Sequence, residues 1–432
     1  MSLRRTMLPL LMLTLAACTA TQRPGVQDPV VNEIAEEYVR LVLAVGEHDE
    51  HYVDAYYGPA AWREQVRAQA RALPAIVGQA AALEARLASL PAAVDSLSAL
   101  RQRYLSRQLQ ALEHLARKRL GETLGFDAEA RALYDIEPPV STEAELAARL
   151  APIEQALPGE APIAERYNAY IERFAIAPDR IEAVMRAAIA EARQRTAQHI
   201  TLPAGERFEL ALLKDKPWSA YNWYQGNYHS RIEINTELPL TVTRAIELAV
   251  HEGYPGHHVY NALLERSLVR ERGWVEYSVY PLYSPQSLIA EGSADYALTL
   301  AFPLEQRIRF VEEVLFPLAG FDPAEARRYV EVSEAARVTG LATIEAARRY
   351  LDGRADAAAT KAFLQRYALA SPGRAEQRLR FFDAYGAYIV NYALGESLVA
   401  DYVERQAGSD VAARWRVFAE LLATPQLPSS LR

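Results

Sequence analysis

The chain has 432 residues, of which 55 are acidic and 47 are lysine or arginine, so its formal net charge is −8. Nucleic-acid binding rewards a basic surface that neutralises phosphates, and this acidic balance argues against nucleic acid as a partner. The length exceeds the usual size of one hydrophobic core, which predicts two packed subdomains. Because Cys18 is the single cysteine, a disulfide bond within the monomer is excluded.

Residues 1–17 read as a lipoprotein signal peptide. A short basic region precedes an apolar run at residues 7–15, which is too short for an ordinary membrane span. The run ends in L-A-A-C at Cys18, the pattern of a bacterial lipoprotein cleavage box, so we expect Cys18 to be the lipidated first residue of the mature protein. An uncleaved hydrophobic helix is the alternative.

This signal predicts a protein that is anchored to a membrane and does not span it. Residues 18–30 are expected to form a tether between the lipid and the folded part of the chain. Thr19 follows the cysteine where an aspartate would indicate retention in the inner membrane of a Gram-negative cell. We therefore expect the cell envelope as the location, at the periplasmic face of the outer membrane.

Helical periodicity predicts that residues 31–202 form an N-terminal helical subdomain. Apolar residues recur at three- and four-residue spacing in several stretches, at 31–45, 90–120 and 177–197. Thr142 followed by Glu145 predicts a capping box at the start of another helix. The segment 54–59 is expected to be a loop with a packing role, and a position at the cleft is the alternative.

The composition changes at residue 203, where a second subdomain, 203–432, is expected to begin. Alternating polar and apolar residues at 208–212 and 231–235 predict strands, and Gly226 with Asn227 marks a turn. These signals predict a small antiparallel sheet.

An edge strand of such a sheet can hold an extended peptide through its unpaired backbone groups. Ile232, Ile234 and Asn235 are our candidates for this substrate-binding role. A purely structural ribbon is an equally good interpretation.

Three of the eight histidines of the chain fall in one octet, H-E-G-Y-P-G-H-H, at residues 251–258. Neutral imidazole is the commonest protein ligand of zinc, and a neighbouring carboxylate can deprotonate a water. In the usual H-E-x-x-H helix the second histidine lies one turn after the first, but that position is Pro255 here. On a straight helix His257 would lie about 9 Å along the axis from His251, too far to share one ion.

Pro255 and Gly256 offer a way to shorten that distance. Proline removes a helical hydrogen bond and glycine adopts unusual dihedral angles, so a bulge or a broken turn can absorb the two extra residues. We therefore predict His251 and His257 as metal ligands, with His258 beside a ligand or facing the substrate. The alternative is that Pro-Gly ends the helix and the histidines form a polar loop.

A third ligand is predicted downstream, where Glu291 and Asp295 are four residues apart in a helical stretch. A catalytic zinc site has three protein ligands and one open position. A glutamate that binds the metal is often followed, one turn later, by an acid that accepts the N–H of a ligand histidine. Glu291 and Asp295 fit these two roles, and a solvated acidic helix face is the alternative.

At this point the chain resembles a family of bacterial proteins, domain of unknown function 885, whose H-E-x-x-P-G-H motif matches residues 251–257 without a gap. The family's E-G-x-A stretch is matched by residues 291–294 and its late Y-x-x-G by residues 392–395. The resemblance implies a mostly helical, zinc-peptidase-like protein. Ser293 stands where the family has a tryptophan, and residues 338–342 lack the acid and the histidine of the family pattern.

Together these features predict a zinc-dependent hydrolase, most simply a metallopeptidase, in which His251, His257 and Glu291 bind Zn²⁺. Glu252 is the expected general base. A tyrosine hydroxyl is expected to stabilise the oxyanion, and the candidates are first Tyr392 and then Tyr388. The predicted fold is mainly α, a large two-lobed, zincin-like (gluzincin-like) architecture with a small antiparallel sheet before the metal-motif helix.

Arg380 is a candidate for binding a substrate carboxylate, with a surface ion pair as the alternative. Three rival functions remain open. The first is a metal-binding lipoprotein without catalysis, and the second is an anchored helical scaffold whose octet is a loop. The third, a variant of the main hypothesis, is a zinc hydrolase of non-peptide amides or esters. Metal content separates the scaffold from the others, and substrate profiling separates the rest.

Overall fold

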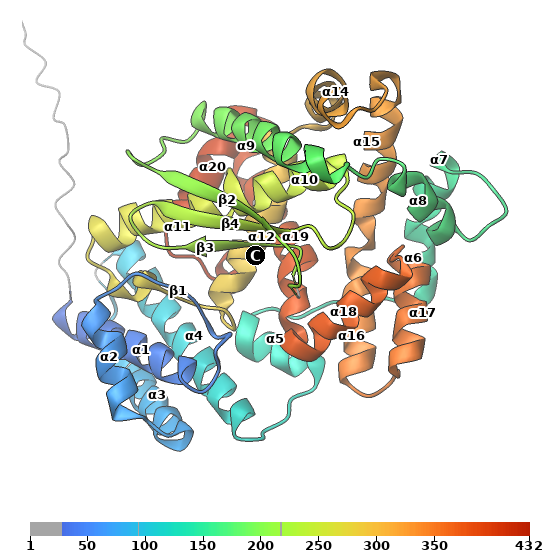
Figure 1. Ribbon diagram of the computed structural model, residues 1–432. Coiled ribbons are helices and arrows are strands. Elements are labelled where there is room, and N and C mark those ends of the chain that lie inside the picture. Colours follow the sequence, from blue (N-terminus) through green and yellow to red (C-terminus); the bar gives the residue numbers. More distant parts are fainter. Residues whose placement is uncertain (1–27, 94, 217) are drawn as a thin grey trace, which may run out of the picture.

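The computed structural model describes residues 28–93, 95–216 and 218–432. In these residues the fold is mainly helical, as the sequence predicts, and two small sheets interrupt the helices (Figure 1). The signal segment 1–17 and the lipidation site Cys18 lie outside the described residues. Within the described ranges, no helix combines the length and the apolar character that a membrane span requires.

Helices fill the chain up to residue 197, in the order α1 (Pro29–Gly46), α2 (Ala60–Gln69), α3 (Leu73–Ala88), α4 (Ser96–Arg119), α5 (Phe126–Tyr134), α6 (Glu143–Arg149), α7 (Ala151–Ala156), α8 (Ile163–Glu172) and α9 (Ile181–Ala197). Asp28 caps α1, because its carboxylate accepts the backbone N–H of Val30 at 2.9 Å. The capping box predicted from Thr142 and Glu145 is confirmed at the start of α6.

The segment before the metal motif forms a three-stranded sheet with the strand order β2 (Arg207–Leu213), β4 (His229–Asn235), β3 (Ala220–Tyr224). β3 and β4 pair antiparallel, with Ala220 opposite Ile234. The turn between them has positive φ at Gly226 and Asn227, where the sequence predicts it. β2 pairs with β4 in parallel, so the predicted small sheet is present but mixed.

The position of β4 overturns the predicted peptide-binding edge. β4 is the central strand, and its backbone groups pair with β2 on one side and β3 on the other. Ile232 and Ile234 are 1% and 0% exposed, and the side-chain amide of Asn235 donates hydrogen bonds to the carbonyls of Lys216 and Trp218. An incoming strand can add only at an edge, which in this sheet belongs to β2 or β3.

A second, two-stranded sheet corrects the loop expected at residues 54–59. Residues Val53–Tyr56 form β1, which pairs antiparallel with β5 (Val279–Pro281), with Ala55 opposite Tyr280. The pairing joins the N-terminal part of the chain to the segment directly before α12. It therefore carries Asp54 toward the region of the predicted metal ligands.

Helices again dominate the rest of the chain, in the order α10 (Val242–Leu248), α11 (His257–Leu264), α12 (Pro285–Ala301), α13 (Leu304–Phe310), α14 (Phe316–Ala319), α15 (Ala326–Ala335), α16 (Gly340–Leu351), α17 (Ala357–Tyr367), α18 (Pro372–Tyr385), α19 (Val390–Ala407) and α20 (Val411–Ala423). Nearly every residue of α12 is buried, as expected for a helix without a polar face at the centre of the fold. The helix carries Glu291.

Two glycines allow α12 and α19 to cross in direct backbone contact. A Cβ atom added to Gly292 would lie 2.3 Å from the carbonyl carbon of Gly395, a distance that real side chains do not tolerate. Gly292 follows Glu291, and Gly395 lies three residues after Tyr392. The close crossing therefore brings a predicted metal ligand and a predicted catalytic tyrosine to the same place.

We expect the Gly292→Ala substitution to destabilise the fold by about 1–3 kcal/mol, because the added methyl group must push the two helices apart. Urea unfolding followed by circular dichroism measures this loss. Gly78 is a matched control, since it lies inside α3 and an added Cβ would meet nothing within 4 Å. Gly78→Ala is expected to be stabilising by about 0.5–1 kcal/mol, and equal effects at the two positions would contradict the close crossing.

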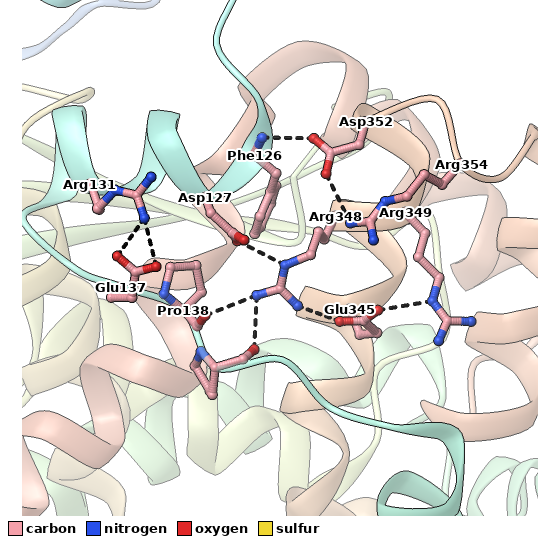
Figure 2. Close-up of polar contacts among 11 residues, drawn as sticks. Phe126, Asp127, Arg131, Glu137, Pro138, Glu345, Arg348, Arg349, Asp352 and Arg354 are labelled. Atoms are coloured by element: carbon pink, nitrogen blue, oxygen red, sulfur yellow. Dashed lines mark hydrogen bonds and ion pairs between the residues drawn. The ribbon is translucent and has the colours of Figure 1, made fainter.

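The hydrophobic core and buried ion pairs connect the two predicted subdomains. One continuous cluster of buried apolar residues extends from Val31 to Leu431. Figure 2 shows Arg348 of α16 reaching Asp127 of α5 and the carbonyl of Pro138. The Arg348–Asp127 distance is 2.8 Å, and the guanidinium also donates to the carbonyl of Pro139. The division of the chain at residue 203 stays a prediction, but the parts on either side of it share their interior.

Candidate metal centre

The two predicted histidine ligands come together because the helix is distorted between them. α10 continues into a π-helical turn, Ala249–Gly253, and α11 starts again at His257. The Tyr254–Pro255 peptide bond between these helices is cis. A Cβ atom on Gly256 would lie 2.0 Å from the carbonyl oxygen of His251, so only glycine fits at this position.

This turn absorbs the two additional residues, as predicted. The ring centroids of His251 and His257 lie 4.6 Å apart, with the rings nearly perpendicular. The Gly256 N–H donates to the carbonyl of Val250 at 3.0 Å, which ties the break to the end of the preceding helix. The alternative, in which the histidines form a polar loop after the helix ends, is wrong, because His251 lies in the π-helical turn and His257 begins α11.

Glu291 completes a group that could hold a metal ion. Its Oε2 lies 3.1 Å from Nε2 of His251, and its Oε1 lies 3.6 Å from Nε2 of His257. One possible ligand atom from each of the three residues lies within 4.8 Å of the other two. Two imidazole nitrogens and one carboxylate form the donor set of many catalytic zinc sites.

Asp295 orients His251. It lies one helical turn after Glu291 on α12, and its Oδ1 accepts a hydrogen bond from Nδ1 of His251 at 2.8 Å. This bond leaves Nε2 of the ring free to point toward Glu291. Glu291 and Asp295 therefore both contact His251 from the same helix, as predicted.

The electrostatics of the group suit a cation. Burial acts to lower the pKa of His251, but the carboxylates of Asp295 and Glu291 outweigh it and hold that pKa well above its usual value. Oε2 of Glu291 is buried and accepts no hydrogen bond, although such atoms are normally satisfied. A metal ion would supply the missing partner, so the residues present could hold one.

Glu252 lies beside the first ligand and faces the same pocket. The pocket is lined by the three residues of the metal group and by Glu252. The side-chain amide of Asn222 donates to the backbone carbonyl of Glu252 at 2.6 Å, which ties the end of the motif helix to β3. Burial raises the pKa of the Glu252 carboxyl, against the opposing charges of His251 and His257.

Both predicted tyrosines line this pocket, and they differ in their contacts. Tyr388 donates its hydroxyl to Oε1 of Glu291 at 2.7 Å, so it supports a metal ligand. The ring of Tyr392 lies 6.3 Å from that of His251 and nearly parallel to it. Among the described residues the Tyr392 hydroxyl has no hydrogen-bond partner, which leaves it available to a substrate.

His258 does not take the predicted place beside a ligand or substrate. It is 1% exposed, its Nδ1 contacts the Ser230 hydroxyl at 2.8 Å, and its Nε2 contacts Oε2 of Glu206 at 2.9 Å. The same Glu206 oxygen accepts the Tyr254 hydroxyl at 2.5 Å. His258 is the next residue after His257 on α11, so its side chain leaves the helix in a different direction. It points to the sheet and anchors the broken turn.

Arg380 is also not part of the pocket. It is exposed on α18, and its charge acts on Glu376 one turn earlier, as a surface ion pair would. Arg378 is the arginine of this helix that approaches the site, with its guanidinium 5.7 Å from the centre of the Phe381 ring. Phe381 is one of the residues that line the pocket.

Sequence reasoning missed most of the pocket wall. Asn222 from β3 lines it, and so do several aromatic residues from β3, β5 and α18, namely Tyr221, Tyr280, Phe381 and Tyr385, together with Trp218. Asp54 from β1 also lines it, so the alternative of a cleft position for the segment 54–59 holds for this residue. The aromatic-rich stretch before the motif was a second signal, which the pattern alone could not direct toward a site.

Comparison with known proteins gives the fold. No protein-family profile and no curated protein sequence matches this chain. The structure is similar to that of a predicted lipoprotein from Colwellia psychrerythraea, with a TM-score of 0.53 and 15% sequence identity, over 82% of this chain. A predicted lipoprotein of unknown function from Shewanella oneidensis is also similar, with a TM-score of 0.45 and 12% identity, over 91% of this chain and 82% of that protein. The chain spans about 65% of the length of the Colwellia protein, and at this identity the likeness shows a shared fold.

Proposed function

We propose that this protein is a zinc-dependent hydrolase that cleaves peptide bonds. The observation that carries the proposal is the convergence of His251, His257 and Glu291 in a pocket that Glu252 also lines. A zinc peptidase needs three protein ligands for the metal and a neighbouring acid. An aromatic-lined pocket gives room for a substrate side chain.

The residues divide the work as follows. When bound, zinc supplies Lewis acidity that activates a water and polarises a carbonyl. Glu252 accepts the proton of the attacking water and returns it to the leaving amine, and its burial-raised pKa suits this exchange. Tyr392 donates its free hydroxyl to the developing oxyanion. Asp295 and Tyr388 hold His251 and Glu291 in place.

β3 offers the backbone for binding an extended substrate. It is an edge strand of the three-stranded sheet, and its residues Ala220, Tyr221 and Asn222 line the pocket. The strand-addition hypothesis therefore moves from β4 to β3, since the free edge of β3 retains donors and acceptors.

The proposal also includes the family to which the chain belongs and its location in the cell. Membership of the domain of unknown function 885 family is supported by the H-E-x-x-P-G-H motif at residues 251–257 and by the contact between Gly292 and Gly395, which come from its two other matched stretches. Lipid anchoring at Cys18 is supported by the cleavage box, and its place on the periplasmic face of the outer membrane rests on Thr19 alone. The description of the Colwellia protein as a predicted lipoprotein is consistent with the anchoring.

A peptide-library digestion tests the proposal. Residues 19–432 are loaded with one equivalent of Zn²⁺ and incubated with the library, and cleavage is followed by mass spectrometry beside a chelator-treated sample. We expect stoichiometric zinc and cleavage that the chelator abolishes and added zinc restores. Bound zinc without any cleavage favours the inactive metal-binding lipoprotein, cleavage confined to a panel of amides and esters favours a non-peptide hydrolase, and no bound zinc rejects the site.

A further inference from the structure

Asp54 is an acid at the pocket wall that the proposed mechanism does not use. It lies on β1, which pairs with β5, and it lines the pocket that contains His257 and Glu291. The Tyr221 hydroxyl, from β3, donates a hydrogen bond to its Oδ1. The carboxylate is therefore held in one orientation by a residue of a different sheet.

No cation forms an ion pair with this acid. Across the part of the chain that the structure describes, no lysine, arginine or histidine lies within ion-pair distance of Asp54, and its side chain has the Tyr221 hydroxyl as its hydrogen-bond partner. Burial raises its pKa to about 7, against the lowering effects of the Tyr221 hydrogen bond and of the more distant His257. A buried carboxylate without an ion-pair partner destabilises the folded state. This suggests that a bound molecule supplies the partner of Asp54.

The charge of the pocket indicates the sign of that partner. Asp54, Glu252 and Glu291 line it, and within the described residues its lining contains no lysine or arginine. A wall of this composition attracts cations and repels carboxylates. Glu291 is committed to the metal group and Glu252 to proton transfer, so Asp54 is the acid left for the substrate.

The aromatic neighbours of Asp54 suit an ammonium group. Tyr221 and Trp218 both line the pocket, with ring centroids 5.6 Å apart. Tyr385 lines the pocket as well, and the charge of Asp54 acts on its hydroxyl. Aromatic faces bind ammonium ions by cation–π attraction, and an acid beside them adds a charged hydrogen bond.

We propose that Asp54, positioned by Tyr221, binds an ammonium group of the substrate next to the scissile bond. This inference rests on the proposed peptidase function and specifies its substrate class. Two sources share the chemistry, namely the α-ammonium group of a peptide N-terminus and the side chain of a lysine residue.

Matched peptides distinguish the two sources. The hydrolysis of a leucine-initiated peptide is compared with that of its N-acetylated form, and an N-acetylated peptide containing lysine is compared with one containing norleucine. We expect wild-type protein to prefer the ammonium-bearing member of one pair. Asp54→Asn should lower kcat/KM for that member by roughly 10- to 100-fold and leave its partner unchanged. Tyr221→Phe should act in the same direction and less strongly.

A binding measurement tests the role of Asp54 without requiring catalytic turnover. The affinity of zinc-loaded protein for leucine hydroxamate and for N-acetyl-leucine hydroxamate, or for lysine-bearing N-acetylated equivalents, is measured by calorimetry. A preference for the ammonium form that Asp54→Asn removes supports the proposal. Glu209→Gln, which removes an exposed carboxylate from the edge strand β2, should change neither affinity.

Failure of the inference about Asp54 can be distinguished from failure of the peptidase proposal. Peptide cleavage with the same preferences in wild type and Asp54→Asn overturns the role of Asp54 and leaves the peptidase proposal intact. Loss of cleavage of both members of a pair, with unchanged zinc content, indicates that Asp54 serves the reaction and not recognition, and it also overturns the inference. Absence of cleavage and of hydroxamate binding in wild type overturns both proposals.

Discussion

The Glu252→Gln protein is expected to bind zinc as tightly as wild type and to hydrolyse peptides about 10²- to 10⁴-fold more slowly. Glutamine keeps the size and the polar character of the side chain but cannot accept the proton of a water. Glu252 is not one of the three residues of the metal group, and its carboxylate faces the pocket beside His251. The measurement combines zinc analysis with kcat on a peptide identified from the library.

Glu247→Gln serves as the matched control. Glu247 lies on the same helix, four residues before His251, and its carboxylate pairs with Arg244 at 3.0 Å, outside the pocket lining. Removing its charge should leave kcat within a few-fold of wild type, since a surface pair contributes little. A Glu252→Gln protein with near-normal kcat would exclude Glu252 as the general base, whatever its zinc content.

The metal ligands could be predicted because local rules determine them. Pro255 cannot continue the hydrogen bonding of a helix, and Gly256 occupies a position with no room for a Cβ atom. The sequence shows that proline and glycine stand there, and their general backbone properties predict the break; the lack of room at Gly256 is seen only in the structure. Glu291 and Asp295 follow the same logic, because a spacing of four residues brings side chains to one face of a helix.

The order of the strands could not be predicted in this way. Alternation in β4 correctly indicates that Ile232 and Ile234 are buried, but it does not predict that Glu233 and Asn235 are buried as well. The same alternation fits a central or an edge strand. The partner of each strand depends on how distant segments pack. The predicted edge at Ile232 and Ile234 therefore lies in the middle of the sheet.

Most of the pocket wall was missed for the same reason. Asp54 of β1 meets Tyr221 of β3, a contact between segments far apart in the chain. Arg380 was the wrong arginine because the rotation of a helix separates residues two apart by about 200°. Arg378 therefore turns toward Phe381 while Arg380 faces solvent.

Substitution of the adjacent histidines 257 and 258 should have opposite consequences. We expect His257→Ala to lower zinc affinity by more than the 10- to 100-fold that is typical of losing a group which only supports a ligand. We expect His258→Ala to keep zinc and to lower the free energy of unfolding by about 1–3 kcal/mol. His257 belongs to the metal group, whereas His258 is buried between Ser230 and Glu206, which would lose their partner.

Competition with a chromophoric chelator measures the affinities, and urea unfolding in the presence of a strong chelator compares the metal-free folds. Using the metal-free state matters, because a bound ligand adds its own stabilisation to the native state. In that state His257→Ala should lose less stability than His258→Ala, since the His257 side chain is 12% exposed, whereas that of His258 is 1% exposed and contacts Ser230 and Glu206. The reverse pattern, with zinc lost in His258→Ala and kept in His257→Ala, would mean that the turn at Gly256 has a different register and that the second ligand lies one residue later.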